Sequence, residues 1–331
     1  MTLTNTLKVN EAAPLLSPRL SVERSPERPH PTSGFKSIFV GPNGLRAGWR
    51  VLIFGALVVV LIGSFVLIRA GGIQGLREAK KHAAELTVTP LLMFKGEAIA
   101  FLLICVATLI MGKIEHRKFS EYGLPLRLAL RKDFWIGAGS GFLAITGTLL
   151  TIFLLHGFRV TGLALHGTAI VSSMLGWGIA FLMVGLFEEL LNRGYIQYTL
   201  ASGIGFWPAA LVMSFLFGFG HYFNANETLV GSISAGLFGL LFCFFLRRTG
   251  NLWIAVGFHA AWDWGQIFYG VPDSGIVPYH NVLSSTFSGP RWLTGGIVGP
   301  EASIVCPIAL LVVGLIFSRC CRENEMLTAR S

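Results

Sequence analysis

The chain has 331 residues, of which 53% are hydrophobic and only 13% are charged, about half the charged share of a soluble globular domain. A soluble fold of this length cannot cover its surface with so few charges, so the composition indicates a polytopic membrane protein. Intrinsic disorder, collagen and coiled coil are excluded, because each needs a polar bias or a short repeat.

The net charge is +9, which in a soluble protein would point to nucleic acid. In a membrane protein, the loop cations that set orientation account for it. We therefore expect the lipid bilayer, and no nucleic acid, as a partner; the oligomeric state stays open. The five cysteines show no metal-type spacing, and we expect no disulfide framework.

Composition along the chain divides it into four parts. Residues 1–45 are polar and dotted with proline, so they predict a disordered cytoplasmic tail without a cleavable signal peptide. Residues 46–133 predict the first two transmembrane helices and a basic cytoplasmic loop. Residues 134–270 hold the least charged stretch and predict a helical core. Residues 271–331 predict a last loop, a final transmembrane helix and a short cytoplasmic tail.

Apolar runs of about 20 residues, the length that a helix needs to cross a bilayer, recur along the chain. Lipid permits only helices or closed barrels, and the runs lack the two-residue alternation of a barrel. The predicted fold is therefore all-α, a polytopic transmembrane helical bundle of about eight spans. These spans are 51–68, 91–112, 134–156, 169–190, 206–223, 229–246, 251–269 and 301–318. In the third span, Gly137 and Gly141 lie one turn apart, a spacing that predicts close helix packing.

With eight spans, most lysines and arginines fall on one side of the membrane, and the positive-inside rule makes that side cytoplasmic. Both termini then face the cytoplasm (N-in/C-in), and we expect an integral protein of the plasma (inner) membrane. The loop 71–90, with Arg77, Lys80 and Lys81, runs against the rule. No internal repeat of the kind that builds two-fold transporters is visible.

Two adjacent carboxylates, Glu188 and Glu189, lie near the end of an uncharged run. A charge at membrane depth costs on the order of 3 kcal/mol, so such residues usually have a function. The alternative is that they simply end the span at the interface. On a helix their side chains diverge by about 100°. Glu189 faces Arg193 at i+4, in the favourable order for an ion pair, so we assign this pair to the scaffold and leave Glu188 free to react.

Two histidines and an aspartate lie in the next apolar runs. His221 ends one run, where a lone histidine is more often a satisfied interfacial residue than a ligand. His259 and Asp263 share one helix face at i, i+4 within the seventh span. They either address one cavity or form a buried pair that ties helices together.

Carboxylates and histidines from three consecutive spans suit hydrolysis, with a carboxylate taking the proton from water and histidines orienting it. The same side chains could instead hold a divalent metal such as zinc, which lowers the pKa of bound water toward about 7. The zinc ligands would be Glu188, His221, His259 and Asp263. No serine or cysteine lies beside these groups in a way that suggests a covalent nucleophile.

Three motifs in order resemble those of a known family. They are Glu188-Glu189 with Arg193, Phe217 with His221, and His259 with Asp263. This pattern resembles the CPBP intramembrane proteases, the CAAX-protease and bacteriocin-processing group related to the Ras-converting enzyme type of prenyl-protein endopeptidase. The resemblance spans about residues 135–270, and it makes 134–270 a CPBP-type intramembrane protease core.

The resemblance implies a CAAX-type membrane endopeptidase that cleaves a peptide bond near the membrane surface in a peptide or membrane-protein substrate. It puts Glu188, Glu189, Arg193, His221, His259 and Asp263 in the catalytic site. By analogy, Glu188 activates water with the help of His221, while His259 and Asp263 stabilise the oxyanion. A carboxylate donates to an oxyanion only when protonated, so a metal-ligand or histidine-orienting role suits Asp263 better. Whether the enzyme is a metalloprotease or a glutamate-type protease is left open.

Two other classes of protein use buried carboxylates and histidines. A non-catalytic membrane immunity or scaffold protein would use them as interhelical pairs. An ion-coupled transporter would move a proton or ion through them, with uptake that depends on an ion gradient. Loss of function in Glu188→Ala at unchanged folded amount favours the protease over the scaffold.

Overall fold

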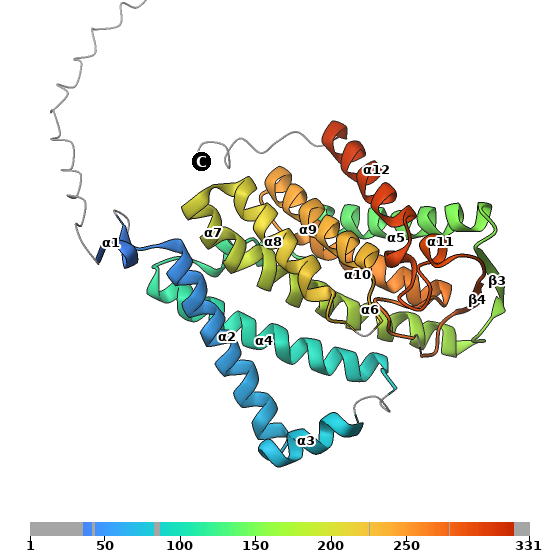
Figure 1. Ribbon diagram of the computed structural model, residues 1–331, viewed down its shortest axis with the longest axis horizontal. Coiled ribbons are helices and arrows are strands. Elements are labelled where there is room, and N and C mark those ends of the chain that lie inside the picture. The colour runs from blue at the N-terminus through green and yellow to red at the C-terminus, as the bar shows by residue number, and fades with distance from the viewer. Residues whose placement is uncertain (1–35, 42–43, 83–86, 225, 278, 321–331) are drawn as a thin grey trace, which may run out of the picture. The chain divides into compact units, whose positions relative to one another are not determined.

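The computed structural model describes residues 36–41, 44–82, 87–224, 226–277 and 279–320, which fall into two units divided after Leu45 (Figure 1). In the first unit, a short helix α1 (Lys36–Phe39) leads into a two-stranded antiparallel hairpin of β1 (Val40–Gly41) and β2 (Gly44–Leu45). Residues 36–41 and 44–45 thus have structure where we predicted a disordered tail. The rest of that predicted tail, residues 1–35, lies outside the described residues.

The second unit is mostly helical, as predicted, and each of the eight expected spans coincides with a helix. These helices are α2 (Ala47–Arg69), α4 (Pro90–Ile114), α5 (Lys132–Leu154), α6 (Thr168–Glu189), α8 (Phe206–His221), α9 (Leu229–Thr249), α10 (Trp253–Tyr269) and α12 (Val305–Cys320). The shorter elements are α3 (Ile73–His82), α7 (Gln197–Ile204), α11 (Arg291–Thr294), the 3-10 turns η2 (Phe119–Tyr122), η3 (Leu126–Leu128) and η5 (Pro300–Ala302), and the π-helical turn η4 (Leu190–Ile196).

Within the described part of the chain, five helices are long and apolar enough to cross a membrane. They are Ala47–Arg69, Pro90–Ile114, Lys132–Leu154, Leu229–Thr249 and Thr168–Ile204, which joins α6 to α7 through η4. Helices α8 and α12 are apolar but shorter, and α10 has 17 residues. The membrane-protein class is therefore confirmed, whereas the count of eight spans and the N-in/C-in topology stay predictions.

A small antiparallel sheet departs from the all-helical prediction. Strand β3 (Phe158–Leu163) follows α5, and its partner β4 (Leu283–Phe287) follows α10 far along the chain. Of the six residues in β3, only Phe158 is buried. Buried and exposed residues therefore do not alternate along β3. Strands are predicted from such alternation in the sequence, so this strand was not predicted.

Helices α5 and α10 pack so closely that glycine is required between them. A Cβ atom added to Gly137 would lie 2.1 Å from the carbonyl oxygen of Ile254, and one added to Gly141 would lie 2.2 Å from that of Phe258. The close packing predicted from the glycine spacing is confirmed. Because α10 carries His259 and Asp263, this contact fixes the position of both residues along the axis of α5.

A second close contact joins α8 to α9, where a Cβ on Gly218 would lie 2.5 Å from the carbonyl oxygen of Ser232. Buried aromatic side chains, which include Phe238, Phe242 and Phe258, fill the space between α9 and α10. These contacts place α8, α9 and α10 around a common interior.

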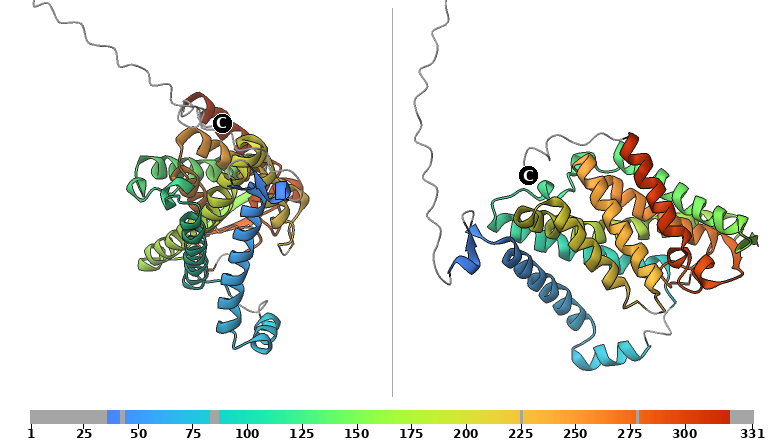
Figure 2. Two further views of the ribbon diagram at one scale, coloured as in Figure 1. Left: turned by 90° about the vertical axis from the view of Figure 1, so that its left-hand side faces the viewer. Right: turned by 45° about the horizontal axis from the view of Figure 1, so that its top comes forward.

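Helix α2 is attached to the bundle near its beginning and diverges from it toward α3, as Figures 1 and 2 show. Nε of Arg50 donates to Oε1 of Glu115 at 2.9 Å, and the hydroxyl of Tyr195 donates to the same oxygen. In α2 only Phe54 is buried, and its ring stacks on that of Tyr195 at 4.3 Å. Most of α2 is therefore free to face lipid.

Candidate active site

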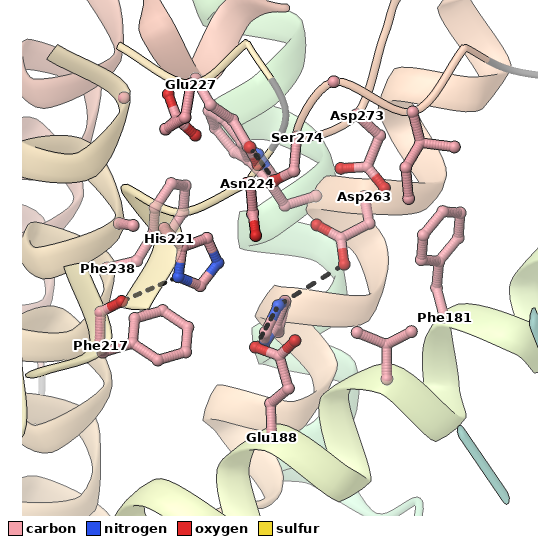
Figure 3. A pocket seen from close by; sticks show the side chains of 18 of the residues that line it. Phe181, Glu188, Phe217, His221, Asn224, Glu227, Phe238, Asp263, Asp273 and Ser274 are labelled. Atoms are coloured by element: carbon pink, nitrogen blue, oxygen red, sulfur yellow. Dashed lines mark hydrogen bonds and ion pairs between the residues drawn. The ribbon is translucent and has the colours of Figure 1, made fainter. Parts of the chain in front are cut away.

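A cavity of about 380 Å³ is enclosed by α4, α6, α8, α9 and α10, together with the segment after α10 and Glu301 (Figure 3). The predicted residues Glu188, His221, His259 and Asp263 all line it. The further polar side chains on its walls are Glu97, Asn224, Glu227, Asp273, Ser274 and Glu301. Four side chains predicted from three separate motifs thus face one cavity.

Glu188 lies in the last turn of α6 with its side chain 26% exposed. Its Oε2 atom is buried and has no hydrogen-bond partner among the described residues, and it lies 3.8 Å from Nε2 of His259. Nδ2 of Asn192, one turn further along, donates to the backbone carbonyl oxygen of Glu188 at 2.8 Å. Glu188 therefore presents an unengaged carboxylate oxygen beside the imidazole.

Glu189 is fully buried and does not line the cavity. Its Oε1 accepts a hydrogen bond from Nη1 of Arg193 at 3.1 Å, so the predicted ion pair is confirmed. The same oxygen lies 3.0 Å from Nδ1 of His259. Because a carboxylate oxygen accepts, Nδ1 carries the proton and donates to it. Glu189 therefore orients a histidine as well as pairing with an arginine, and the second contact was not predicted.

Arg193 lies in the π-helical turn η4 and is 1% exposed. Its guanidinium stacks over the ring of Phe217 at 4.2 Å and lies 5.5 Å from that of Phe242. These cation–π contacts replace the water that a buried guanidinium would otherwise need. Arg193 thus contacts Glu189 and Phe217 but does not itself line the cavity.

His221 ends α8, and its Nδ1 lies 2.8 Å from the backbone carbonyl oxygen of Phe217. A carbonyl oxygen only accepts hydrogen bonds, so Nδ1 must carry a proton. In the neutral ring, Nε2 is then a free acceptor. Figure 3 shows the ring at the cavity wall across from Glu188.

His259 and Asp263 point to the same side of α10, as their spacing predicts. Nε2 of His259 lies 3.6 Å from Oδ2 of Asp263, which is beyond hydrogen-bond distance. Asp263 is 5% exposed. Glu188, Glu189 and Asp263 therefore surround one imidazole with three carboxylates.

Two acidic residues that sequence reasoning missed, Asp273 and Glu301, lie next to Asp263. Nε2 of Gln266 donates to Oδ1 of Asp273 at 2.7 Å and to Oε1 of Glu301 at 3.1 Å, and Nε1 of Trp262 donates to Oε1 of Glu301 at 3.0 Å. Burial, followed by the neighbouring charges of Asp263 and Glu301, raises the pKa of Asp273 well above its ordinary value. The sequence does contain one feature that could have pointed to them, because 273 and 301 are the only acidic positions between Trp264 and Cys320.

Glu227, in the turn before α9, also lines the cavity. Its Oε1 accepts from the backbone N–H of Thr228 at 2.6 Å. Burial raises the pKa of Glu227, an effect that this hydrogen bond partly offsets.

The zinc set predicted from the sequence is not assembled in the described part of the chain. Ligand atoms of three His, Cys, Asp or Glu residues lie within 4.8 Å of one another at Asp263, Asp273 and Glu301. That group offers oxygen atoms alone, whereas zinc sites in proteins are built mainly from nitrogen and sulfur. Nδ1 of His259 donates to Glu189, which leaves Nε2 as the ring atom that could bind a metal. Among the described residues, the four predicted zinc ligands therefore do not form a close group, and zinc binding stays a prediction.

Comparison with known proteins gives one match. Residues 170–265 match the family model described as Type II CAAX prenyl endopeptidase Rce1-like. The matched segment runs from α6 into α10 and contains all three motifs. No curated protein and no solved structure matches the chain. Over residues 170–265 the chain is therefore similar to the Rce1-like family of type II CAAX prenyl endopeptidases, which supports the resemblance to CPBP and CAAX proteases, and the chain is an integral membrane protein.

Proposed function

We propose that the protein is an intramembrane endopeptidase of the plasma membrane that hydrolyses a peptide bond close to the membrane surface. The observation that carries the proposal is the difference between two adjacent carboxylates. Glu188 faces the cavity with a buried, unengaged oxygen, whereas Glu189 is held by Arg193 and His259. A carboxylate oxygen without a donor can take a proton from water.

In the proposed reaction a water molecule lies between Glu188 and His221. Nε2 of His221 accepts one of its hydrogen bonds, because Nδ1 donates to the carbonyl oxygen of Phe217. Glu188 takes the other proton as the water oxygen attacks the carbonyl carbon. The same proton passes to the amine nitrogen when the C–N bond breaks. The carboxylic acid that forms gives the remaining water proton to Nε2 of His221, which leaves a carboxylate and an amine.

His259 stabilises the oxyanion of the tetrahedral intermediate. With Nδ1 donating to Glu189, the ring offers N–H from Nε2 only as an imidazolium, a charge that the three surrounding carboxylates favour by Coulomb attraction. Nε2 lies near both Glu188 and Asp263, at the edge of the cavity where a carbonyl oxygen would enter. A preorganised donor of this kind accounts for a large part of catalysis in acyl-transfer enzymes.

The proposed mechanism is that of a glutamate-type protease and passes through no metal, since the predicted zinc ligands do not form a ligand set. Both termini are proposed to face the cytoplasm. The eight predicted spans are even in number, and the basic segments that this predicted topology places at the cytoplasmic side support the orientation.

The experiment is cleavage of a peptide library by the full-length protein in lipid nanodiscs, read by mass spectrometry. We expect cleavage by the wild type and none by Glu188→Gln. Glu78→Gln serves as the matched control, because Glu78 lies on α3 with its side chain 63% exposed and paired with Lys81. If the folded wild type cleaves no peptide, a non-catalytic membrane protein becomes the better interpretation.

A further inference from the structure

Carboxylic side chains predominate among the ionisable residues of the cavity walls. Six carboxylic side chains line the cavity, and none of the described residues that line it is lysine or arginine. The six are Glu97, Glu188, Glu227, Asp263, Asp273 and Glu301. Low-dielectric walls focus the field of such charges into the enclosed space, so the cavity attracts cations and repels anions.

The negative charge is densest next to the proposed catalytic groups. Oxygen atoms of Asp263, Asp273 and Glu301 lie within 4.8 Å of one another, and both aspartates are 5% exposed. Apart from Asp263's neighbour His259, the hydrogen-bond donors to this group are neutral side chains, namely Gln266, Trp262 and Ser274. In the described part of the chain, His259 is the one cationic neighbour of these three carboxylic groups, so a further cation placed among them is favoured.

Asp263 gives a second, independent indication of a ligand. Its carboxylate is more than nine-tenths buried and accepts no hydrogen bond from the described residues, and its nearest ionisable neighbour is Nε2 of His259 at 3.6 Å. Figure 3 shows the carboxylate of Asp263 turned into the cavity, near Asp273 and Ser274. A carboxylate that faces a cavity and accepts no hydrogen bond from the described residues, with the imidazole of His259 near it, can accept hydrogen bonds from a ligand in that cavity.

Other parts of the cavity wall are apolar. Phe181 and Val184 of α6 and Phe238 of α9 line the same cavity as the three carboxylates. A lysine or arginine side chain combines an apolar stem with a terminal cation, so it matches a cavity of apolar walls and acidic end. A bare metal ion would use the acidic end alone and leave the apolar walls without a partner.

We propose that Asp263, Asp273 and Glu301 form a subsite for the ammonium or guanidinium group of a lysine or arginine that flanks the scissile bond. This inference rests on the proposed function and names its substrate class, a peptide or membrane-protein segment with a basic residue at the cleavage point. His259 links the subsite to Glu188 through contacts of 3.6 and 3.8 Å, so the cation lies beside the bond that is cut. A substrate with an acidic residue at this position is repelled.

The test uses the full-length protein in nanodiscs and peptides that differ only at the two positions flanking the cleaved bond. Lysine, arginine, norleucine and glutamate are compared at each position, and norleucine keeps the stem of lysine without its charge. We expect kcat/KM for lysine or arginine to exceed that for norleucine at least tenfold at one position, and glutamate to be the poorest. This comparison needs no variant, so it stands even if a substitution prevents folding.

Two variants test whether Asp273 and Glu301 cause the preference for lysine or arginine. Asp273→Asn and Glu301→Gln keep the shape of each side chain and remove one carboxyl group that can pair with the cation, and each should lower the ratio of lysine to norleucine about tenfold. Glu78→Gln removes a charge outside the cavity and should leave that ratio unchanged. The ratio cancels any general loss of activity, which a merely structural role would produce.

The outcomes separate the two proposals. Equal rates for lysine and norleucine overturn the subsite and leave the protease intact, whereas a folded wild type that cleaves none of the peptides overturns both. Binding of Mn²⁺ or Ca²⁺ that is lost in Asp273→Asn, together with loss of norleucine cleavage on chelation, would overturn the subsite in favour of a metal site.

Discussion

A single carboxylate oxygen, Oε1 of Glu189, lies 3.0 Å from Nδ1 of His259 and 3.1 Å from Nη1 of Arg193. The first contact joins α6 to α10, and the second joins the end of α6 to the π-helical turn that follows it. Glu189 therefore couples the position of the proposed oxyanion donor to the ion pair that stabilises the bend of the chain.

Glu189→Ala should lose both stability and activity. The substitution leaves the fully buried guanidinium of Arg193 without its ion-pair partner, which costs about 3–5 kcal/mol of unfolding free energy. It also frees the imidazole of His259. Denaturant titration in detergent gives the stability, and Glu189→Gln, which keeps one acceptor oxygen, should fall between the wild type and alanine. Unchanged stability with lost activity would contradict the scaffold role.

Glu188→Gln should abolish the reaction and leave the fold intact. The amide cannot take a proton from water, so kcat should fall by about 10²–10⁴. Glu188 Oε2 has no hydrogen-bond partner among the described residues, so stability should change by no more than about 0.5 kcal/mol. Single-turnover kinetics and a melting curve on the same sample test both statements. Turnover at the wild-type rate would remove Glu188 from the mechanism.

Asp263→Asn and Asp263→Ala test whether the residue at position 263 donates a hydrogen bond to the oxyanion. An asparagine amide can donate to the oxyanion beside Nε2 of His259, whereas alanine cannot, so kcat for a norleucine peptide should be about 10²-fold higher in the asparagine variant. Equal activities of the two variants would show that position 263 supplies no hydrogen bond to the transition state. Circular dichroism of both variants controls for folding.

Gly141→Ala should destabilise the bundle and displace α10. Its new methyl group would lie 2.2 Å from the carbonyl oxygen of Phe258, and relief of that overlap costs roughly 1–3 kcal/mol. Gly139→Ala is the matched control, because a Cβ there meets no atom within 4 Å. Thermal unfolding should separate the two variants, and activity should follow the loss of stability. Equal melting temperatures would refute the tight α5–α10 contact.

Removal of metal should leave peptide cleavage unchanged. The proposed mechanism uses Glu188, His221 and His259 without a metal, so protein dialysed against EDTA should keep its kcat and contain no stoichiometric zinc. Elemental analysis and kinetics on one preparation test this. Cleavage that disappears with EDTA and returns with zinc would instead support a metalloprotease that uses the ligand set predicted from the sequence.

The sequence predicted the helices and the face that each motif presents. The length of the apolar runs located the eight helices that coincide with predicted spans. The i, i+4 spacings predicted the Glu189–Arg193 pair and the shared face of His259 and Asp263. The spacing of Gly137 and Gly141 foretold the close contact with α10. Each of these is a local relationship, fixed by the geometry of a single helix.

What escaped prediction depends on contacts between distant segments. The Glu189–His259 hydrogen bond spans 70 positions, and nothing in the local sequence of either residue specifies the other. Asp273 and Glu301 lie outside the expected core, and their proposed role depends on their closeness to Asp263. The number of crossings also depends on more than apolarity, because α8 and α12 are shorter than a membrane span requires.

The glycine contacts place the proposed catalytic groups on two close-packed pairs of helices. Glu189, His259 and Asp263 belong to the α6–α10 side, which Gly141 locks to α5, whereas His221 belongs to α8, which Gly218 locks to α9. Between them the ring of Phe217 faces the guanidinium of Arg193, a contact without the strict directionality of a hydrogen bond. Buried aromatic side chains also join α9 to α10. The distance from Glu188 to His221 therefore depends on how α8 packs on α9, whereas the position of the oxyanion donor depends on the hydrogen bond between Glu189 and His259.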